Sequence, residues 1–341
     1  MKIAQIAPPW LPVPPRGYGG IEWVVSLLSD GLVERGHEVT LFAPGDSTTT
    51  ATLESVFPVA PGPDAINSIW YDVVHAGFAL RGADRFDVLH VHPWWSSLVA
   101  AVQTPVPVVH TLHTAFFDHV RRIYTQVYDL AWFVAISEAQ LAQMPELRSA
   151  GVVYNGIDLD LYPLQREKED FLLFLGRTAP EKGLARAILA ARAAGYRLIC
   201  AVKVSSETER REWEDNIEPL LGDDVEVLGE ITHDEKVDLL RRARAVLFPI
   251  DWDEPFGLVM TEAMACGTPV IATRRGSVPE VIADGETGFI VEVEQFVEQT
   301  VDRLRRLDDI DPAACRSRVE DHFSRRAMLD GYERVYRQIV G

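Results

Sequence analysis

Residues 248–269 read FPIDWDEPFGLVMTEAMACGTP, and this stretch decides the fold because it passes from a strand into a helix through a short loop. The apolar residues that lead to Pro249 predict a buried strand. Pro255 and Gly257 then predict the start of a helix that runs to about Gly267. A strand followed at once by a helix is the repeating unit of α/β proteins with a parallel sheet.

The start of this helix is a predicted anion site. The backbone N–H groups of Gly257, Leu258 and Val259 would be unpaired and would lie at the positive end of the helix dipole, where a phosphate is stabilised. Glu254 lies in the loop just before the helix, and Glu262 lies about 1.5 turns inside it. Two carboxylates on either side of a phosphate site predict a ligand with a negative middle and hydroxylated ends, such as a nucleotide sugar.

The same strand and helix rhythm extends along the chain and predicts two α/β domains. The apolar runs that predict buried parallel strands are residues 3–7, 39–43, 88–92, 106–110, 133–136, 152–154, 171–175, 198–202, 225–228, 245–249, 270–273 and 288–291.

A polar segment at residues 158–170, broken by Pro163, separates the two series of strands. We therefore expect two Rossmann-like doubly wound domains, at residues 1–163 and 164–322, and a C-terminal helix at 323–341 that can cross back to the first domain. Doubly wound sheets bind ligands at the carboxyl ends of their strands, so we expect a ligand cleft where the two domains face each other.

The first strand of the second domain leads into a loop with two cations. Gly176 and Arg177 follow the strand, and Lys182 and Gly183 end the loop. Arginine supplies a forked donor and lysine a point charge, and this pairing suits a diphosphate. Solvated surface charge is the alternative interpretation.

A glycine loop also follows the first strand of the first domain. Gly19 and Gly20 precede an amphipathic helix, where backbone N–H groups suit an anion. The loop lacks the GxGxxG spacing of dinucleotide-binding proteins. A turn with a purely structural role is the alternative.

Composition limits the partners and the compartment. The 341 residues include 33 Lys and Arg against 51 Asp and Glu, a net charge of −18, which disfavours nucleic acid and anionic membranes as partners. Three cysteines without CxxC spacing predict buried thiols in a reducing compartment. The sequence contains no run of about 18 apolar residues, so it predicts no membrane span. Pro8 and Pro9 interrupt the N-terminal apolar run too early for a signal peptide. We therefore expect a cytoplasmic protein.

Several motifs together carry a family resemblance. Glu254 and Glu262 form an E-x7-E motif, which is followed by Gly-Thr-Pro-Val at 267–270 and Gly-Ser-Val-Pro-Glu at 276–280. With the Gly-Arg and Lys-Gly pairs at 176–183 and Asn-Gly-Ile-Asp at 155–158, the chain resembles the retaining glycosyltransferases of family 4, which have the GT-B fold. The resemblance covers nearly the whole chain.

The resemblance implies roles for individual residues. Arg177 and Lys182 match the side chains that bind the donor diphosphate. Glu262 matches the glutamate that binds the ribose, and Glu254 matches the one that contacts the sugar near the bond that is cut. His113 matches a histidine that contacts the transferred sugar. The implied catalytic residues are thus His113, Arg177, Lys182 and Glu254.

The remaining implied donor-binding positions are loop residues. Besides Arg177, Lys182 and Glu262, they are Gly19, Gly20, Gly176, Gly229, Phe256, Gly257, Leu258 and Val259. Gly229 lies in the loop where the base normally rests, and Ser137 and Asn155 lie in matched segments without an assigned role.

The resemblance implies the transfer of a hexose from a nucleoside diphosphate sugar, UDP-sugar favoured over GDP-sugar, to a hydroxyl of a small-molecule or glycan acceptor. The implied mechanism is front-face and needs neither metal nor cofactor, and membrane association is the less favoured option. Two alternatives stay open: a GT-B nucleotide-sugar epimerase and a catalytically silent nucleotide-sugar-binding protein.

Three further patterns compete with this interpretation. Asp251 and Asp253 form a D-x-D pair, the metal and diphosphate motif of the other large glycosyltransferase fold, but the neighbouring cations already serve phosphate. His90 and His92 share one face of a strand as zinc ligands can, although a packed or acceptor-lining role is favoured. The adjacent tryptophans at 94–95 either line the acceptor site or simply pack.

Overall fold

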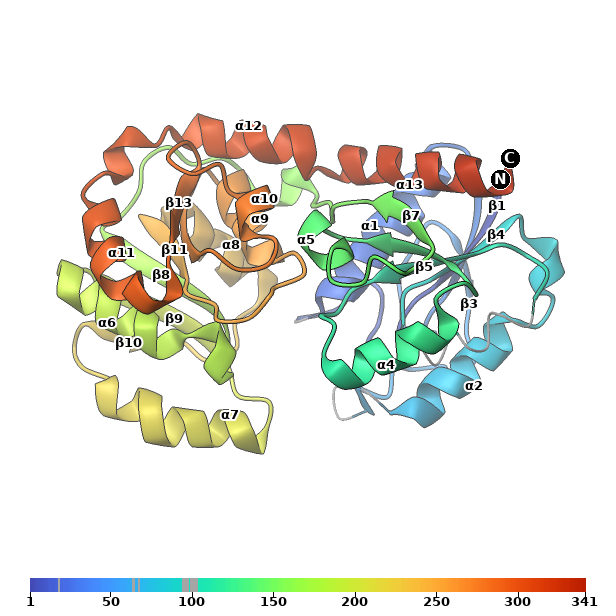
Figure 1. Cartoon of the computed structure of the whole chain (residues 1–341), viewed down its shortest axis with the longest axis horizontal. Coiled ribbons are helices and arrows are strands. Elements are labelled where there is room, and N and C mark those ends of the chain that lie inside the picture. The colour runs from blue at the N-terminus through green and yellow to red at the C-terminus, as the bar shows by residue number, and fades with distance from the viewer. Residues whose placement is uncertain (18, 63–64, 67, 94–97, 99–103) are drawn as a thin grey trace. The chain divides into compact units, whose positions relative to one another are not determined.

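The chain forms two compact α/β units, each with its own parallel sheet. The computed structural model describes residues 1–17, 19–62, 65–66, 68–93, 98 and 104–341 (Figure 1). Unit 1 consists of Met1–Ile157 together with Arg325–Gly341, and unit 2 is Asp158–Ser324. The chain therefore leaves unit 1, builds unit 2 and returns to unit 1 for its last helix.

Unit 1 contains a seven-stranded parallel sheet in the order β3-β2-β1-β4-β5-β6-β7. Its strands are β1 (Lys2–Ile6), β2 (Glu38–Phe42), β3 (Thr52–Glu54), β4 (Val88–Val91), β5 (Val108–Leu112), β6 (Trp132–Ala135) and β7 (Ser149–Val152). The sequence predicts six of them, although it places the last one at residues 152–154, which share only Val152 with β7. It misses β3, because three partly exposed residues at a sheet edge carry too little hydrophobic pattern.

Helices pack on both faces of this sheet. They are α1 (Gly20–Glu34), α2 (Ile69–Ala79), α4 (Asp118–Val127), α5 (Glu138–Leu141) and α13 (Arg325–Val340). The main hydrophobic core joins the sheet to α2 and α4, whereas α13 packs against α1 (Figure 1). Gly31 permits this close packing, because a Cβ there would lie 2.5 Å from the Leu329 side chain.

Unit 2 contains a six-stranded parallel sheet in the order β10-β9-β8-β11-β12-β13. Its strands are β8 (Phe171–Arg177), β9 (Arg197–Lys203), β10 (Val225–Val227), β11 (Ala245–Phe248), β12 (Val270–Thr273) and β13 (Gly288–Val291). Its helices are α6 (Leu184–Ala194), α7 (Glu207–Glu212), α8 (His233–Arg242), α9 (Leu258–Ala265), α10 (Val278–Val281), α11 (Phe296–Leu304) and α12 (Pro312–His322). Helix α6 packs with α11, and α9 packs with α8 and α12. The predicted strands of this unit are confirmed.

Each sheet reverses its strand order at one point, and this point positions the site. The order changes direction between β1 and β4 in unit 1 and between β8 and β11 in unit 2. At such a switch point the loops leave the carboxyl ends of neighbouring strands in opposite directions, which opens a crevice for a ligand. The two loops of unit 2 at this point are those that the sequence singles out for phosphate.

Two expectations from composition can be compared with the structure. Cys200, Cys266 and Cys315 are buried free thiols, as predicted, and burial raises the pKa of each to about 12. Among the residues that the structure describes, no helix has both the length and the apolar character that a membrane span requires.

Candidate active site

Helix α9 begins where the sequence predicts. Gly257 caps it with φ of 78°, a left-handed conformation that favours glycine. The amides of Leu258 and Val259 form its first turn, where N–H groups have no carbonyl partner within the helix. The structure therefore presents the helix start that the anion site requires.

Lys182 and Glu254 form an ion pair beside this helix start. Lys182 ends the 3-10 turn that follows β8, and its Nζ lies 2.6 Å from Glu254 Oε2. The two side chains are only 17% and 13% exposed, so water screens the pair weakly. The ammonium also lies 4.7 Å from the centre of the Trp252 ring, within cation–π range. Two residues that the sequence assigns to different parts of the donor are thus in direct contact.

Backbone contacts fix the loops that carry this pair. A Cβ on Gly183, which has φ of 74°, would lie 2.2 Å from the carbonyl oxygen of Pro249. The Asp251 N–H donates to the carbonyl of Glu181 at 2.8 Å. On the other side, a Cβ on Gly276 would lie 2.4 Å from the carbonyl oxygen of Glu254. Glycines allow the three loops to pack backbone against backbone, which holds Lys182 and Glu254 in place.

Arg177 is anchored by a residue that the sequence does not reveal. Its guanidinium pairs with the buried carboxylate of Glu209, and its own side chain is 36% exposed. Glu209 Oε2 also accepts from the backbone N–H of Ser205 at 2.5 Å. Glu209 lies in the highly charged helix α7, whose composition predicts only a solvated surface. No local signal distinguishes it from its neighbours.

Glu262 is buried in α9 and held by two donors. Its Oε1 accepts from the Tyr162 hydroxyl at 2.8 Å and lies 2.6 Å from Lys236 Nζ. Burial, together with the charge of Glu262, raises the pKa of Tyr162, so this hydroxyl remains a donor. The sequence analysis did not identify Tyr162 and Lys236, because they lie 100 and 26 residues away from Glu262.

The other predicted donor-binding positions in unit 2 differ in how strongly the local structure requires the residue that is present. Gly229 has φ of 67° and follows β10, so its conformation favours glycine. Gly176 lies inside β8, and a Cβ there would make only ordinary contacts with the Phe174 ring. Phe256 is buried, and its carbonyl accepts from the Ser277 hydroxyl at 2.8 Å.

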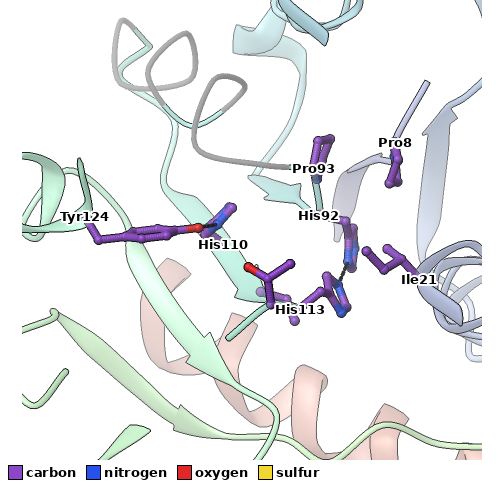
Figure 2. A pocket seen from close by; sticks show the side chains of 9 residues that line it. Pro8, Ile21, His92, Pro93, His110, His113 and Tyr124 are labelled. Carbon is purple, nitrogen blue, oxygen red and sulfur yellow. Dashed lines mark hydrogen bonds between the residues drawn. The ribbon is translucent and has the colours of Figure 1, made fainter. Parts of the chain in front are cut away.

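His113 lines a small pocket in unit 1 (Figure 2). The pocket is formed by Pro8, Ile21, His92, Pro93, His110, Thr111, His113, Thr114 and Tyr124. His113 Nε2 lies 3.0 Å from His92 Nδ1. Burial lowers the pKa of His113 to about 3, so its imidazole is neutral at pH 7.

The glycine loop of unit 1 leads into the helix that borders this pocket. Gly20 is the first residue of α1, and Gly19 caps it. A Cβ on Gly19 would lie 2.8 Å from Pro15 and 2.9 Å from Glu22 Oε2, so close packing requires glycine there. Burial raises the pKa of Glu22 to about 7.

The competing patterns have structural partners. Asp251 forms ion pairs with Arg275 at 3.0 Å and with Arg186 at 3.5 Å. All four ring nitrogens of His90 and His92 are hydrogen-bonded to other side chains, so both histidines are packed groups. Ser137 caps α5 by accepting from the backbone of Gln140. The tryptophans at 94–95 lie outside the described residues.

The structure therefore brings the predicted residues together in separate groups. Lys182, Glu254 and the start of α9 form one group in unit 2, and Glu262 with its two donors forms a second. His113 and the Gly19 loop belong to unit 1.

Comparisons with known proteins identify the family of this chain. Residues 18–161 match the family described as Glycosyltransferase Family 4, and residues 163–317 match Glycosyl transferases group 1. A D-inositol 3-phosphate glycosyltransferase of Mycobacterium bovis is 32% identical over 340 residues, which cover 81% of this chain and 69% of that protein. This chain is a family 4 glycosyltransferase.

Two solved structures share the fold of this glycosyltransferase. AviGT4, a glycosyltransferase involved in avilamycin A biosynthesis, is 28% identical with a TM-score of 0.75, over 99% of this chain and 98% of that one. Anabaena Alr3699/HepE, solved with UDP and glucose, has a TM-score of 0.74 at 19% identity, over 99% of this chain and all of that one. The predicted α/β fold class, with two Rossmann-like parallel sheets of the GT-B type, is confirmed, and so is the assignment as a transferase.

Proposed function

We propose that this glycosyltransferase is a retaining hexosyltransferase that uses a nucleoside diphosphate sugar, with UDP favoured over GDP. The acceptor is a hydroxyl of a small molecule or a glycan. The observation that carries the proposal is the Lys182–Glu254 ion pair beside the start of α9. A cation, a carboxylate and free helix amides within one loop cluster suit the junction of a diphosphate and a sugar.

The catalytic task of unit 2 is to stabilise charge on the leaving diphosphate. Negative charge grows there as the bond to the sugar breaks, and fixed donors stabilise it most when they need no rearrangement. Lys182 and the amides of Leu258 and Val259 serve this role, and Arg177 adds a second cation. Glu254 partly neutralises Lys182 in the resting site. The attraction between Lys182 and the diphosphate grows with the negative charge on the diphosphate, so it is strongest in the transition state.

The proposed reaction keeps the anomeric configuration by a front-face path. The bond between the anomeric carbon and the diphosphate oxygen breaks while the acceptor oxygen bonds to the same face, and the acceptor proton passes to the diphosphate. A double displacement would need a carboxylate below the anomeric carbon, opposite a general acid. We assign no residue to that role, and no step requires a resident metal or cofactor.

The two ends of the donor have separate partners. In this proposal Glu262, which is fixed by Tyr162 and Lys236, accepts hydrogen bonds from the ribose hydroxyls. Gly229 and its loop border the base, and His113 contacts the sugar. The complex of Alr3699/HepE with UDP supports UDP as the first donor to test.

The acceptor is proposed to be water-soluble. The net charge of −18 opposes approach to anionic lipid and to nucleic acid, and it leaves neutral hydroxylated acceptors favoured. Action in the cytoplasm, where nucleotide sugars serve as donors, is part of this proposal.

A ligand screen followed by product analysis tests the function. Thermal shifts are measured with UDP, GDP and ADP and with their glucose, N-acetylglucosamine, mannose and galactose conjugates. A true donor at 100 times its Kd stabilises the protein by about 2.7 kcal/mol. Absence of a shift with every nucleotide and every conjugate would refute the proposal.

Products obtained with the best donor separate the remaining alternatives. NMR of the product should show the anomeric configuration of the donor, and EDTA should leave the rate unchanged. An inverted product would contradict the retaining mechanism, and a rate abolished by EDTA would contradict metal independence. An epimerised sugar formed without acceptor would identify the epimerase alternative, and binding without transfer or hydrolysis would identify a silent binding protein.

A further inference from the structure

A continuous chain of hydrogen bonds runs beneath helix α13 in unit 1. It links side chains from β1, β4, the end of β5 and α13 in the order Tyr332, Thr111, His90, Tyr336, Gln5, His92 and His113. The first six of these residues are buried. None of this chain is apparent in the sequence, since Gln5 and Tyr336 are 331 positions apart.

Gln5 lies in the middle of this series of hydrogen bonds and determines which group donates and which accepts in each bond. A glutamine side chain has one acceptor end, Oε1, and one donor end, Nε2. Gln5 Oε1 lies 2.8 Å from His92 Nε2, so this histidine nitrogen must carry the hydrogen. Gln5 Nε2 donates to the Tyr336 hydroxyl oxygen at 3.0 Å.

On the side of the pocket, the orientation of the Gln5 amide determines the tautomers of His92 and His113. A neutral imidazole carries one hydrogen, so His92 with its hydrogen on Nε2 has a lone pair on Nδ1. His92 Nδ1 therefore accepts from Nε2–H of His113, 3.0 Å away (Figure 2). His113 is then left with a lone pair on Nδ1, which has no hydrogen-bond partner among the residues that the structure describes.

The other arm follows the same direction without conflict. The Tyr336 hydroxyl, which accepts from Gln5, donates to His90 Nδ1 at 2.7 Å. His90 Nε2 then donates to Thr111 Oγ1 at 2.7 Å. The Thr111 hydroxyl in turn donates to the Tyr332 oxygen at 2.9 Å. Rotation of the Gln5 amide by half a turn would reverse every bond in both arms.

This series of hydrogen bonds requires neutral histidines, and burial keeps them neutral. Burial lowers the pKa of His90 and of His92 well below the ordinary value, and the neighbouring histidines lower it further. Burial alone lowers the pKa of His113. A protonated ring would carry hydrogens on both nitrogens and would break the sequence of donors and acceptors.

We propose that Gln5 is a positioning residue that holds His113 in the Nε2–H tautomer, so that His113 Nδ1 accepts a hydrogen bond from a hydroxyl of the transferred sugar. The contact with sugar rests on the proposed function, whereas the tautomer does not. The site then selects donors by chemistry: it accepts a sugar with a free hydroxyl at this position and discriminates against the deoxy analogue, which leaves the lone pair unpaired.

Nitrogen NMR tests the tautomer without any activity. In protein labelled with [15N]histidine, long-range proton–nitrogen spectra at pH 7.5 report which ring nitrogen carries the hydrogen, and His113→Asn assigns the signal. We expect the unprotonated shift for Nδ1 and the protonated shift for Nε2 of His113. The opposite pattern would overturn the proposal.

Substitutions then test the role of Gln5. Gln5→Met keeps the length and removes both hydrogen-bonding ends, and we expect His113 to become a mixture of tautomers. The kcat/KM should fall about tenfold, the usual cost of one misdirected hydrogen bond to substrate. Tyr332→Phe is the matched control, because it removes a buried hydroxyl from the other arm and should leave the His113 spectrum unchanged and turnover within about twofold. An unchanged His113 spectrum in Gln5→Met would refute the role of Gln5.

A second variant keeps the test valid if Gln5→Met does not fold. Tyr336→Phe leaves Gln5 in place and removes the hydroxyl that accepts from Gln5 Nε2 and donates to His90 Nδ1. The amide can then turn over, and a partial change of the His113 tautomer is expected. Monodeoxy analogues of the active donor sugar complete the experiment: the unmodified protein should prefer the parent sugar over one of them, and His113→Asn should lose this preference. The expected tautomer combined with no such loss would support the role of Gln5 and overturn only the contact with sugar.

Discussion

The candidate residues of unit 2 are charged and form ion pairs, whereas those of unit 1 are joined by hydrogen bonds between neutral groups. In unit 2, the predicted phosphate and ribose positions are ion pairs: Lys182 with Glu254, and Glu262 with Lys236. In unit 1, His113 ends a buried chain of neutral groups. Charges act at a distance and stabilise charge that develops during reaction, whereas neutral hydrogen bonds specify which atom donates and which accepts. Under the proposed function, unit 2 supplies stabilisation and unit 1 supplies orientation.

Acidification should produce the largest difference between the two units, because it should lower the stability of unit 1 more than that of unit 2. The buried histidines of unit 1 with lowered pKa values are His75, His90, His92, His110 and His113. An unfolded histidine gains a proton below about pH 6.5, while these folded ones stay neutral, so the stability of unit 1 falls as the pH drops below 6.5. At pH 5 the loss is on the order of 2 kcal/mol for each of His75, His110 and His113. His90 and His92 contribute a loss in the same direction.

Two groups reduce this contrast. The raised pKa of Glu22 has the opposite sign and offsets about one histidine, and the lowered pKa of half-buried His233 gives unit 2 a smaller loss of its own. Hydrogen exchange at pH 5.0 and 7.5 should still show earlier opening of peptides from residues 1–157 than from 158–324. Equal opening of both sets would contradict the expected difference.

Removal of Lys182, the proposed phosphate-binding cation, should have the next largest effect. Lys182→Ala should lower kcat by about 100-fold or more, because one fixed electrostatic donor is usually worth that much. Arg192→Ala is the control, since it breaks an equally close ion pair with Asp224 on the surface of unit 2 and should leave kcat within about twofold. Normal turnover in a folded Lys182→Ala protein would remove Lys182 from the mechanism.

Substitution of the glycines at the two ends of α6 can measure how much the contact between the site loops contributes to stability. Gly183 and Gly195 have φ of 74° and 76°, so alanine adds the same backbone strain at both. Only at Gly183 would the new Cβ meet the Pro249 carbonyl, and open space surrounds it at Gly195. Gly183→Ala should therefore destabilise the protein by about 2 kcal/mol more than Gly195→Ala. Urea denaturation measures this difference, and equal losses would show that the loop contact is unimportant.

The smallest effect is expected at Glu262. Tyr162→Phe removes one of its two hydrogen-bond donors and leaves Lys236 in place. Because a second donor remains on Glu262, we take the net worth of an ordinary hydrogen bond, about 1 kcal/mol, so nucleotide binding should weaken by about fivefold. Calorimetry with UDP measures the change. Lys236→Met in the same assay should weaken binding more, and the reverse order would show that Tyr162 is the main support.

Local sequence pattern accounts for the fold and for the loops of unit 2. Apolar runs predict twelve of the strands, and Gly257 predicts the start of α9. These signals are local because hydrophobic period and helix capping depend on residues a few positions apart. The roles of Arg177, Lys182 and Glu262 come from the family motifs, and their assignment remains a prediction.

What the tertiary structure decided is the set of partners. The pairing of Lys182 with Glu254, the support of Arg177 by Glu209 and the chain from Gln5 to His113 join residues that no local pattern connects. Gln5 lies beside His90 because β1 and β4 are neighbours in the sheet, and Tyr336 reaches both because the chain returns to unit 1 as α13. The sequence alone determined most of the strands, the start of α9 and the site loops of unit 2. Strand order and the return of the last helix determined which side chains meet, since hydrogen bonds and ion pairs depend on distance in space and not on distance along the chain.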